Sequence, residues 1–258
     1  MKRLHGLDLP LWERYANWLG SVLTGNLGFS RTYNRPVMEI LLPRLGNTVV
    51  LLGLSSIFAI LMAIPLGVIA ATRPRSRLDG AINLFCFAGI SVPPFWLALV
   101  FIMVFAVTLG WLPAGGMGAP DASLFARLEF LVLPVVTLTI ASLASYTRFA
   151  RAAMIEVLRE DYIRTARAKG VPERRVIMGH ALRVAMVSII PVLGIQAGFV
   201  LSGAVYIEIV FQWPGVGRML VDAILTRDIL LVQGGVVFVA ACYVLFNIAV
   251  DVARPQQA

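Results

Sequence analysis

The residues of this chain that could carry out chemistry are few and scattered. The sequence contains no Gly-x-x-x-x-Gly-Lys-Ser/Thr pattern, so it has no phosphate-cradling loop for a nucleotide. His5 and His180, the only histidines, are far apart, and no group of His, Cys, Asp and Glu has the spacing of metal ligands. No nucleophile stands beside a base. We therefore expect no catalytic site, no metal and no cofactor in this chain.

The charged residues concentrate instead in one stretch, Arg148 to Arg183, which holds nine of the 22 basic residues. Residues 161–169 are good helix formers without a breaker. Gly170 then stands where a left-handed helix cap is common, and Pro172 and Glu173 suit the first turn of a new helix. The pattern predicts a helix, a tight turn and a second helix. An ordinary basic cytoplasmic loop would have a similar composition.

The letters of this stretch resemble the EAA loop of ATP-binding-cassette (ABC) importer permeases, most closely those of the dipeptide, oligopeptide and nickel branch. The broad pattern of that family begins Glu-Ala-Ala and has a glycine further on. Here Arg164, Thr165 and Ala166 occupy the first places, and Gly170 keeps the glycine. The missing glutamate departs from the broad pattern but is similar to the peptide branch. The resemblance rests on the runs Tyr162-Ile163-Arg164-Thr165-Ala166-Arg167-Ala168-Lys169-Gly170 and His180-Ala181-Leu182-Arg183.

The resemblance implies an all-α, polytopic membrane bundle that works with other subunits. In that family the loop is a helical hairpin that docks on a cytoplasmic ATPase, so residues 148–183 would form a coupling hairpin. The implied partners are two ATPase subunits, a second permease subunit in a heterodimer, an extracytoplasmic substrate-binding protein and the lipid bilayer, with no nucleic acid. The residues implied to couple to the ATPase are Arg164, Thr165, Ala166, Lys169, Gly170 and Glu173.

The composition of the rest of the chain indicates that the hairpin is attached to a membrane-spanning domain. Hydrophobic residues make up 59% of the chain and charged residues only 14%, values typical of a membrane protein. Cys86 and Cys242 both lie in apolar runs and do not indicate a disulfide. Five charge-free segments are candidates to cross a bilayer. They are residues 47–72, 80–110, 130–147, 184–207 and 229–250, within a transmembrane domain 47–253 that follows an extracytoplasmic or interfacial segment 1–46.

The basic residues also predict the orientation. The loop at Arg73, the hairpin and the tail fall on one side and carry thirteen basic residues, whereas the loops beginning at Trp111 and Glu208 carry three. The basic side is cytoplasmic. We therefore expect a multi-pass protein of a bacterial or archaeal cytoplasmic membrane, with the hairpin inside. The two less basic loops also resemble the peptide branch, in which they face the binding protein.

Three polar or irregular positions are candidates to line a pathway. The pair Pro93-Pro94 must bend or break a helix, and a broken helix within a membrane is tolerated only against protein or a water-filled path. Ser91 and Pro93 therefore either line a passage or mark a packing kink. Gln196 either lines the passage or bonds to another helix. The five segments contain no charged residue in their interiors, which argues against a proton-coupled carrier.

The function that we expect is translocation of peptides or a related solute, such as glutathione or a nickel chelate, with ATP hydrolysed by a separate subunit. An ion-coupled secondary transporter and a non-transporting membrane scaffold remain the alternatives. In the family a first span precedes the part that matches Leu7 to Ser30. Five spans with a cytoplasmic tail leave residues 1–46 outside without a visible means of export. We expect that the start of this sequence is placed too late, with a shorter subunit as the alternative.

Overall fold

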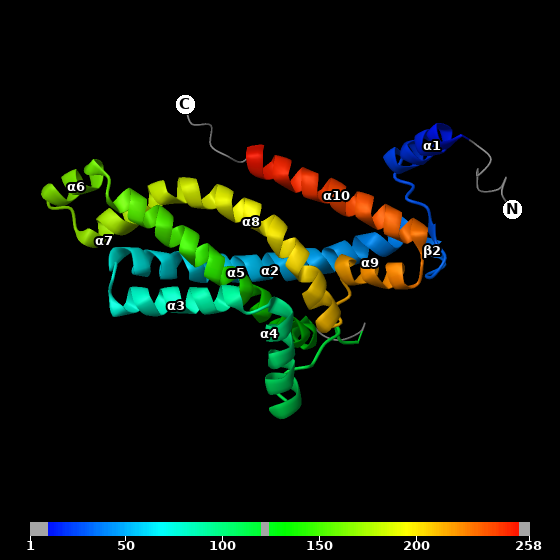
Figure 1. Cartoon of the computed structure of the whole chain (residues 1–258), viewed down its shortest axis with the longest axis horizontal. Helices are drawn as coiled ribbons and strands as arrows, with labels where there is room; N and C mark the ends of the chain where they lie inside the picture. The colour runs from blue at the N-terminus through cyan, green and yellow to red at the C-terminus, as the bar shows by residue number, and fades with distance from the viewer. Residues whose placement is uncertain (1–9, 120–123, 253–258) are drawn as a thin grey trace.

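Three long helices form the centre of the molecule. The computed structural model describes residues 10–119 and 124–252, and its regular structure is almost entirely helical. Helices α2 (Val37–Thr72), α5 (Leu124–Leu158) and α8 (Leu182–Val210) run along the long axis, and α2 packs most extensively against α5 (Figure 1).

Among the residues that the structure describes, three helical segments are long and apolar enough to cross a membrane: Val37–Thr72, Ala126–Leu158 and Glu173–Gly194. A fourth crossing is obtained if a strongly bent pair of helices counts as one span. Helix α10 (Ile229–Val252) contributes a further apolar stretch, Ile229–Leu245, among the residues whose side chains the structure describes. The predicted all-α membrane bundle is confirmed, but the predicted count of five spans is not.

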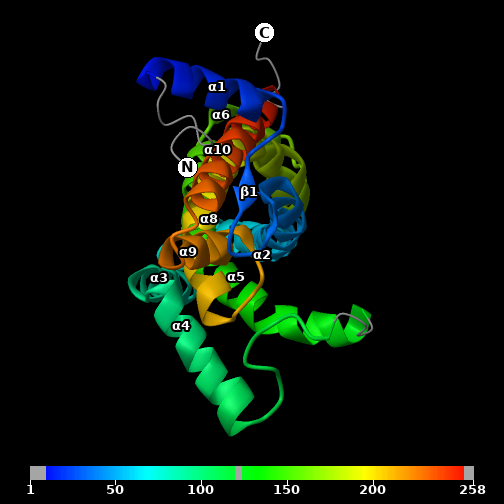
Figure 2. The same cartoon turned by 90° about the vertical axis from the view of Figure 1, so that its right-hand side faces the viewer.

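The bent pair corresponds to the predicted segment 80–110, which is not one straight helix. Helix α3 (Arg77–Ser91) ends before the two prolines, and α4 (Pro94–Phe101) continues as a π-helix, η2 (Ile102–Thr108), at 96° to α3. The residue before a proline is forced out of the helical region, and Val92 is extended, with φ −87° and ψ 122°. Figure 2 shows α4 projecting away from the bundle.

The central helices extend further than the predicted spans. Helix α2 begins at Val37 rather than Asn47, α5 continues past Thr147 to Leu158, and α8 ends at Val210 rather than Ile207. The predicted limits followed the loss of apolar character, whereas charged residues end a membrane segment without ending a helix. The stretches predicted to follow the spans, beginning at Arg148 and at Glu208, therefore start as continuations of α5 and α8.

The two ends of the long axis carry different elements (Figure 1). One end has helices α6 (Asp161–Ala168) and α7 (Glu173–Arg175) beside the α2–α3 turn. The other end has α9 (Val216–Leu225) and a two-stranded antiparallel hairpin. That hairpin follows α1 (Leu11–Leu23), which contributes no buried residue. Its strands are β1 (Phe29–Ser30) and β2 (Arg35–Pro36).

The buried apolar side chains form separate clusters along the bundle. A cluster beneath α6 and α7 joins α5 to the start of α8. A second cluster joins α2, α4, α5 and the end of α8, and its largest side chain is Trp213, which is 1% exposed. A third holds the N-terminal segment against α2, α9 and α10. The loops and short helices at each end of the molecule thus pack on a separate cluster of buried apolar side chains.

Candidate functional site

The predicted coupling hairpin is a helix, a tight turn and a short second helix, as its sequence indicated. Helix α6 is followed by α7 and by a π-helix, η3 (Val176–Ala181), that leads into α8. Gly170 has φ +77°, the left-handed conformation that favours glycine. Its N–H donates to the Arg167 carbonyl at 2.9 Å, and the Val171 N–H donates to the Ala166 carbonyl at 3.2 Å. These bonds cap the end of α6.

One side chain anchors α6 to the rest of the protein. Ile163 is 0% exposed and packs in the cluster that includes Met154, Val157 and Val176. Most of the predicted coupling residues lie on the opposite side of the hairpin, in solvent. Arg164, Thr165, Lys169, Gly170 and Glu173 are exposed, and Ala166 is half-buried. The hairpin therefore has a polar, largely basic exposed surface and is attached to the rest of the protein by a buried apolar side chain.

An ion pair that the sequence analysis did not identify closes the hairpin. The Arg167 guanidinium donates to both carboxylate oxygens of Glu173, at 2.7 and 3.1 Å. The hydrogen bond to Glu173 raises the pKa of Arg167. Both side chains are about half exposed, so the pair sets the shape of the hairpin more than its stability. Arg164 lies 3.5 Å from Asp161, and this fully exposed contact contributes little.

A large apolar cavity lies between α2, α5, α8, α9 and α10, with a volume of about 1100 Å³. Its wall is almost wholly hydrophobic, with Arg183 towards the hairpin and Glu208 towards α9. Ligand-sized cavities with a few polar groups are the common form of a binding site or passage. The polar side chains that line it are Thr48, Ser56, Tyr146, Arg183, Glu208 and Tyr243.

The three predicted pathway residues lie elsewhere in this chain. Ser91 and Pro93 are exposed at the break between α3 and α4, and the Ser91 hydroxyl donates to the Phe87 carbonyl at 2.8 Å. Gln196 is half-buried in α8, two residues beyond Gly194, which does line the cavity. None of the three is among the described residues that line the cavity, so their role in a pathway stays a prediction.

Glu208 is the polar residue of greatest interest that the sequence analysis did not select. The predicted loop placement is wrong, because Glu208 lies in the last turn of α8 and is 0% exposed. Its carboxylate accepts from the Thr48 hydroxyl at 2.6 Å and from the Arg218 N–H at 3.1 Å. A side chain at either Gly215 or Gly217 would meet this carboxylate, so the two glycines allow the close approach.

The same cluster fixes the predicted external turn around Trp213-Pro214-Gly215. The Trp213 indole N–H donates to the Asn47 carbonyl at 3.1 Å, and the Asn47 amide donates to the Pro214 carbonyl at 2.9 Å. The Val216 N–H donates to the Thr48 hydroxyl at 2.9 Å. The partners lie 166 to 168 residues apart in sequence, so no local sequence pattern could have paired them.

Asp228 joins the N-terminal segment to the turn between α9 and α10. Its carboxylate accepts from the Ser30 hydroxyl at 2.6 Å and from the Thr32 N–H at 3.0 Å. The other carboxylate oxygen accepts from the Leu231 N–H at 3.3 Å. Burial raises the pKa of Asp228, but these hydrogen bonds together outweigh it, and the pKa lies below its usual value. Ser30 and Thr32 of the predicted N-terminal segment and the predicted outer loop thus meet at the same end.

Residues 63–255 match the family described as "Binding-protein-dependent transport system inner membrane component". The chain is 39% identical to the oligopeptide transport system permease protein AppB of Bacillus subtilis, over 96% of this chain and 79% of that protein. It is 38% identical to the dipeptide transport system permease protein DppB of Escherichia coli K12, over 95% of this chain and 79% of that protein.

A solved structure has the same fold at much lower sequence identity. An amino acid ABC transporter, crystallised with histidines, superimposes with a TM-score of 0.65. The match covers 84% of this chain and 93% of that one, at 14% identity. At this identity the likeness supports the arrangement of helices described above and carries no information on a ligand.

Proposed function

The chain belongs to the family of binding-protein-dependent transport system inner membrane components, and on this premise we propose that it is the peptide-translocating permease subunit of an ABC importer. The family and the relatives make it a transport permease of a bacterial-type inner membrane. The proposed substrates are dipeptides and oligopeptides, because the relatives named above carry those substrates and are 38–39% identical over nearly the whole chain.

The observation that carries the proposed mechanism is the exposed hairpin on its buried anchor. Ile163 fixes α6 in the cluster beneath it, so a force applied to the exposed residues reaches α5 and the start of α8. We assign ATP hydrolysis to a separate cytoplasmic subunit that docks on the hairpin. This contact uses Arg164, Thr165, Ala166, Lys169, Gly170 and Glu173.

The other proposed partners occupy the opposite end and the cavity face. A substrate-binding protein docks on the end that carries the Trp213 turn and the Asp228 cluster, which two sets of hydrogen bonds hold rigid. A second permease subunit covers the face where the 1100 Å³ cavity opens, so that the two chains enclose the passage. Movement of the hairpins then changes which end of the passage is open.

Peptide uptake with a substitution at Gly170 tests this function. In cells that lack the chromosomal copy, the wild-type chain restores uptake of labelled dipeptides or oligopeptides. Gly170→Asp places a side chain in a left-handed turn and a carboxylate on a basic surface. We expect uptake to fall by about fivefold or more, a typical lower bound for lost coupling between sites, while the protein stays in the membrane. Lys169→Glu, which reverses a charge and leaves the turn unchanged, has the same expected effect.

Gly25→Asp is the matched control for folding and membrane insertion, measured as the amount of protein in the membrane, because Gly25 also has a left-handed φ of +83° but lies at the opposite end. It introduces the same residue and comparable strain away from the ATPase. Normal uptake by Gly170→Asp and Lys169→Glu would contradict the coupling role. Uptake of other solutes but no peptide by the wild-type chain would contradict the peptide assignment.

A further inference from the structure

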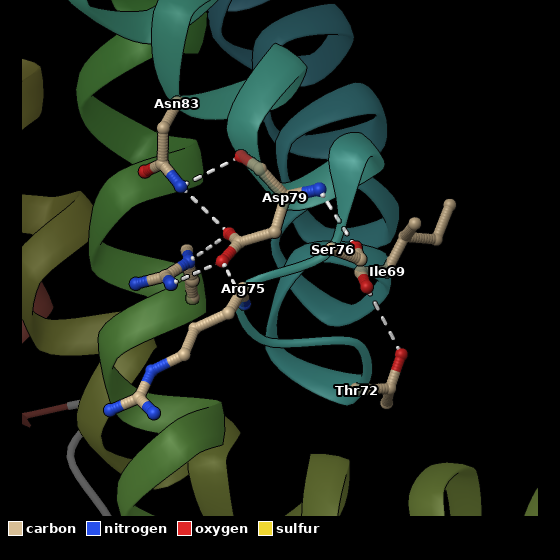
Figure 3. Close-up of polar contacts among 7 residues, drawn as sticks. Ile69, Thr72, Arg75, Ser76, Asp79 and Asn83 are labelled. Carbon is tan, nitrogen blue, oxygen red and sulfur yellow. Dashed lines mark hydrogen bonds and ion pairs between the residues drawn. The ribbon is translucent and has the colours of Figure 1, made fainter.

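Asp79, at the start of α3, is the centre of a buried polar network close to the hairpin (Figure 3). It is 4% exposed, and the Arg151 guanidinium donates to both of its oxygens, at 2.7 and 2.9 Å. The Asn83 amide donates to the same carboxylate at 2.7 Å, and the Arg75 N–H at 2.9 Å. The Ser76 hydroxyl accepts from the Asp79 N–H at 3.1 Å and caps the helix.

This network joins two elements that are distant in sequence. Asp79 belongs to the turn after α2, whereas Arg151 lies on α5, 72 residues later. From Arg151 the helix α5 continues without a break to Leu158, and α6 begins at Asp161. The ion pair therefore lies about two helical turns before the end of α5.

Two close helix contacts accompany the ion pair. A Cβ at Gly67 of α2 would lie 2.6 Å from the Ala150 Cβ and 2.9 Å from the Arg151 N, so α2 and α5 approach in backbone contact. A Cβ at Gly89 of α3 would lie 3.1 Å from the Ala144 Cβ of α5. Small residues allow such approach between membrane helices. Helices α2, α3 and α5 are thus held together by packing along their length and by charge at one end.

Because the Arg151 guanidinium makes two hydrogen bonds to the Asp79 carboxylate, the ion pair restricts the relative orientation of the two side chains. An arginine fork that meets a carboxylate with two parallel bonds fixes distance and angle together, which an apolar contact does not. Removing Arg151 would leave the buried Asp79 carboxylate without its charged partner, a costly state, whereas the Arg151 side chain is 26% exposed. The pair therefore resists both separation and rotation of α3 relative to α5.

We propose that Asp79 and Arg151 are positioning residues that make α2, α3 and α5 move as one body when the hairpin is displaced. Motion delivered to α6 would then reach α3 and the break at Pro93–Pro94 without being lost between the helices. Without the pair, α5 could shift while the α2–α3 turn stayed in place. This proposal rests on the proposed coupling function of the hairpin, and it adds residues outside the surface that an ATPase touches.

Coupling in the assembled transporter tests the proposal. The wild-type chain, Asp79→Asn and Arg151→Lys are purified with their ATPase and second permease, placed in lipid vesicles and supplied with the substrate-binding protein. We measure the ATP hydrolysed per peptide accumulated. We expect Asp79→Asn to raise this ratio by about fivefold or more, within the usual range of coupling effects. Arg151→Lys keeps the charge but not the fork, and we expect an intermediate ratio.

Arg148→Gln is the matched control. Arg148 is an exposed arginine one turn earlier on α5, and its guanidinium lies 5.4 Å from the Phe87 ring centre of α3. The Arg148→Gln substitution removes an arginine between the same two helices and leaves the Asp79 contacts in place. We expect this variant to hydrolyse as much ATP per peptide as the wild type. A wild-type ratio for Asp79→Asn in an assembled complex would overturn the proposal.

A distance measurement separates failure of this proposal from failure of the proposed function. Spin labels at Arg73, in the α2–α3 turn, and at Arg159, beside the hairpin, report how rigidly the two sites are joined. We expect one narrow distance distribution in the wild type and a broader one in Asp79→Asn. A narrow distance distribution in both proteins overturns the positioning role of Asp79 and Arg151 even if transport is coupled. A broadened distribution in a wild-type complex that transports nothing would contradict the proposed function as well.

Discussion

Glu208 holds the loop between α8 and α9 by means of a side chain that is 0% exposed. Its two oxygens accept from the Thr48 hydroxyl and the Arg218 N–H. Thr48 in turn accepts from Val216. The loop can keep its shape only while each of these groups has its partner, because an unpaired polar group in such a site carries its full desolvation cost.

Glu208→Gln should therefore destabilise the protein although it hardly changes the size of the side chain. One amide NH₂ replaces an acceptor and faces a group that donates, so we expect a loss of about 1–3 kcal/mol in the free energy of unfolding. Thermal unfolding in detergent measures the loss, and hydrogen exchange should be faster in residues 211–218. Glu39→Gln, at an exposed position of α2, is the control. Unchanged exchange in the loop would show that Glu208 does not hold it.

Asp228 makes the attachment of the N-terminal segment sensitive to acid. Its pKa in the folded protein is lowered, so its contribution to stability is fully present above its unfolded pKa of about 3.9 and is lost as pH falls through the lower, folded pKa. We expect the melting temperature of the wild type to fall more steeply below about pH 4 than that of Asp228→Asn. Asp222→Asn, in α9, controls for the loss of one acidic group.

At the scale of helices, local steric rules account for what the sequence predicted well. The left-handed turn at Gly170 and the break at Pro93–Pro94 follow from residues that lie side by side in the chain. The pairs Asp79–Arg151 and Thr48–Glu208 lie 72 and 160 residues apart, and no local rule joins them. Helix ends were predicted poorly for a related reason: charge marks where a membrane ends, and helices continue beyond it.

The contact between α2 and α5 should not tolerate even a methyl group. A Cβ at Gly67 would lie 2.6 Å from the Ala150 Cβ, so Gly67→Ala must push two backbones apart. We expect a loss of about 1–3 kcal/mol in the free energy of unfolding, typical of overpacking. Gly53→Ala on the same helix has nothing within 4 Å and should be neutral or slightly stabilising. Equal melting temperatures for the two variants would contradict the close approach.

At the scale of the whole molecule, the orientation of the chain can be tested directly. The basic hairpin and the Asp228 cluster lie at opposite ends of the long axis (Figure 1). In a chain with Cys86 and Cys242 replaced by alanine, we introduce one cysteine at the exposed position His180 or Thr226. A membrane-impermeant maleimide should label Thr226→Cys in intact cells, and His180→Cys only after the membrane is opened. The reverse result would invert the proposed topology.

The break between α3 and α4 also has a consequence for the surrounding lipid. Helix α3 has 15 residues and rises about 22 Å, whereas the hydrocarbon layer of a bilayer is about 30 Å thick. Beyond the break the chain turns by 96° and carries exposed apolar side chains sideways, among them Trp96 and Met103. A helix shorter than the hydrocarbon layer is accommodated by local thinning of the bilayer, at a cost that grows with each ångström of mismatch. We therefore expect the acyl-chain length of the host lipids to change how readily this region adopts its bent form.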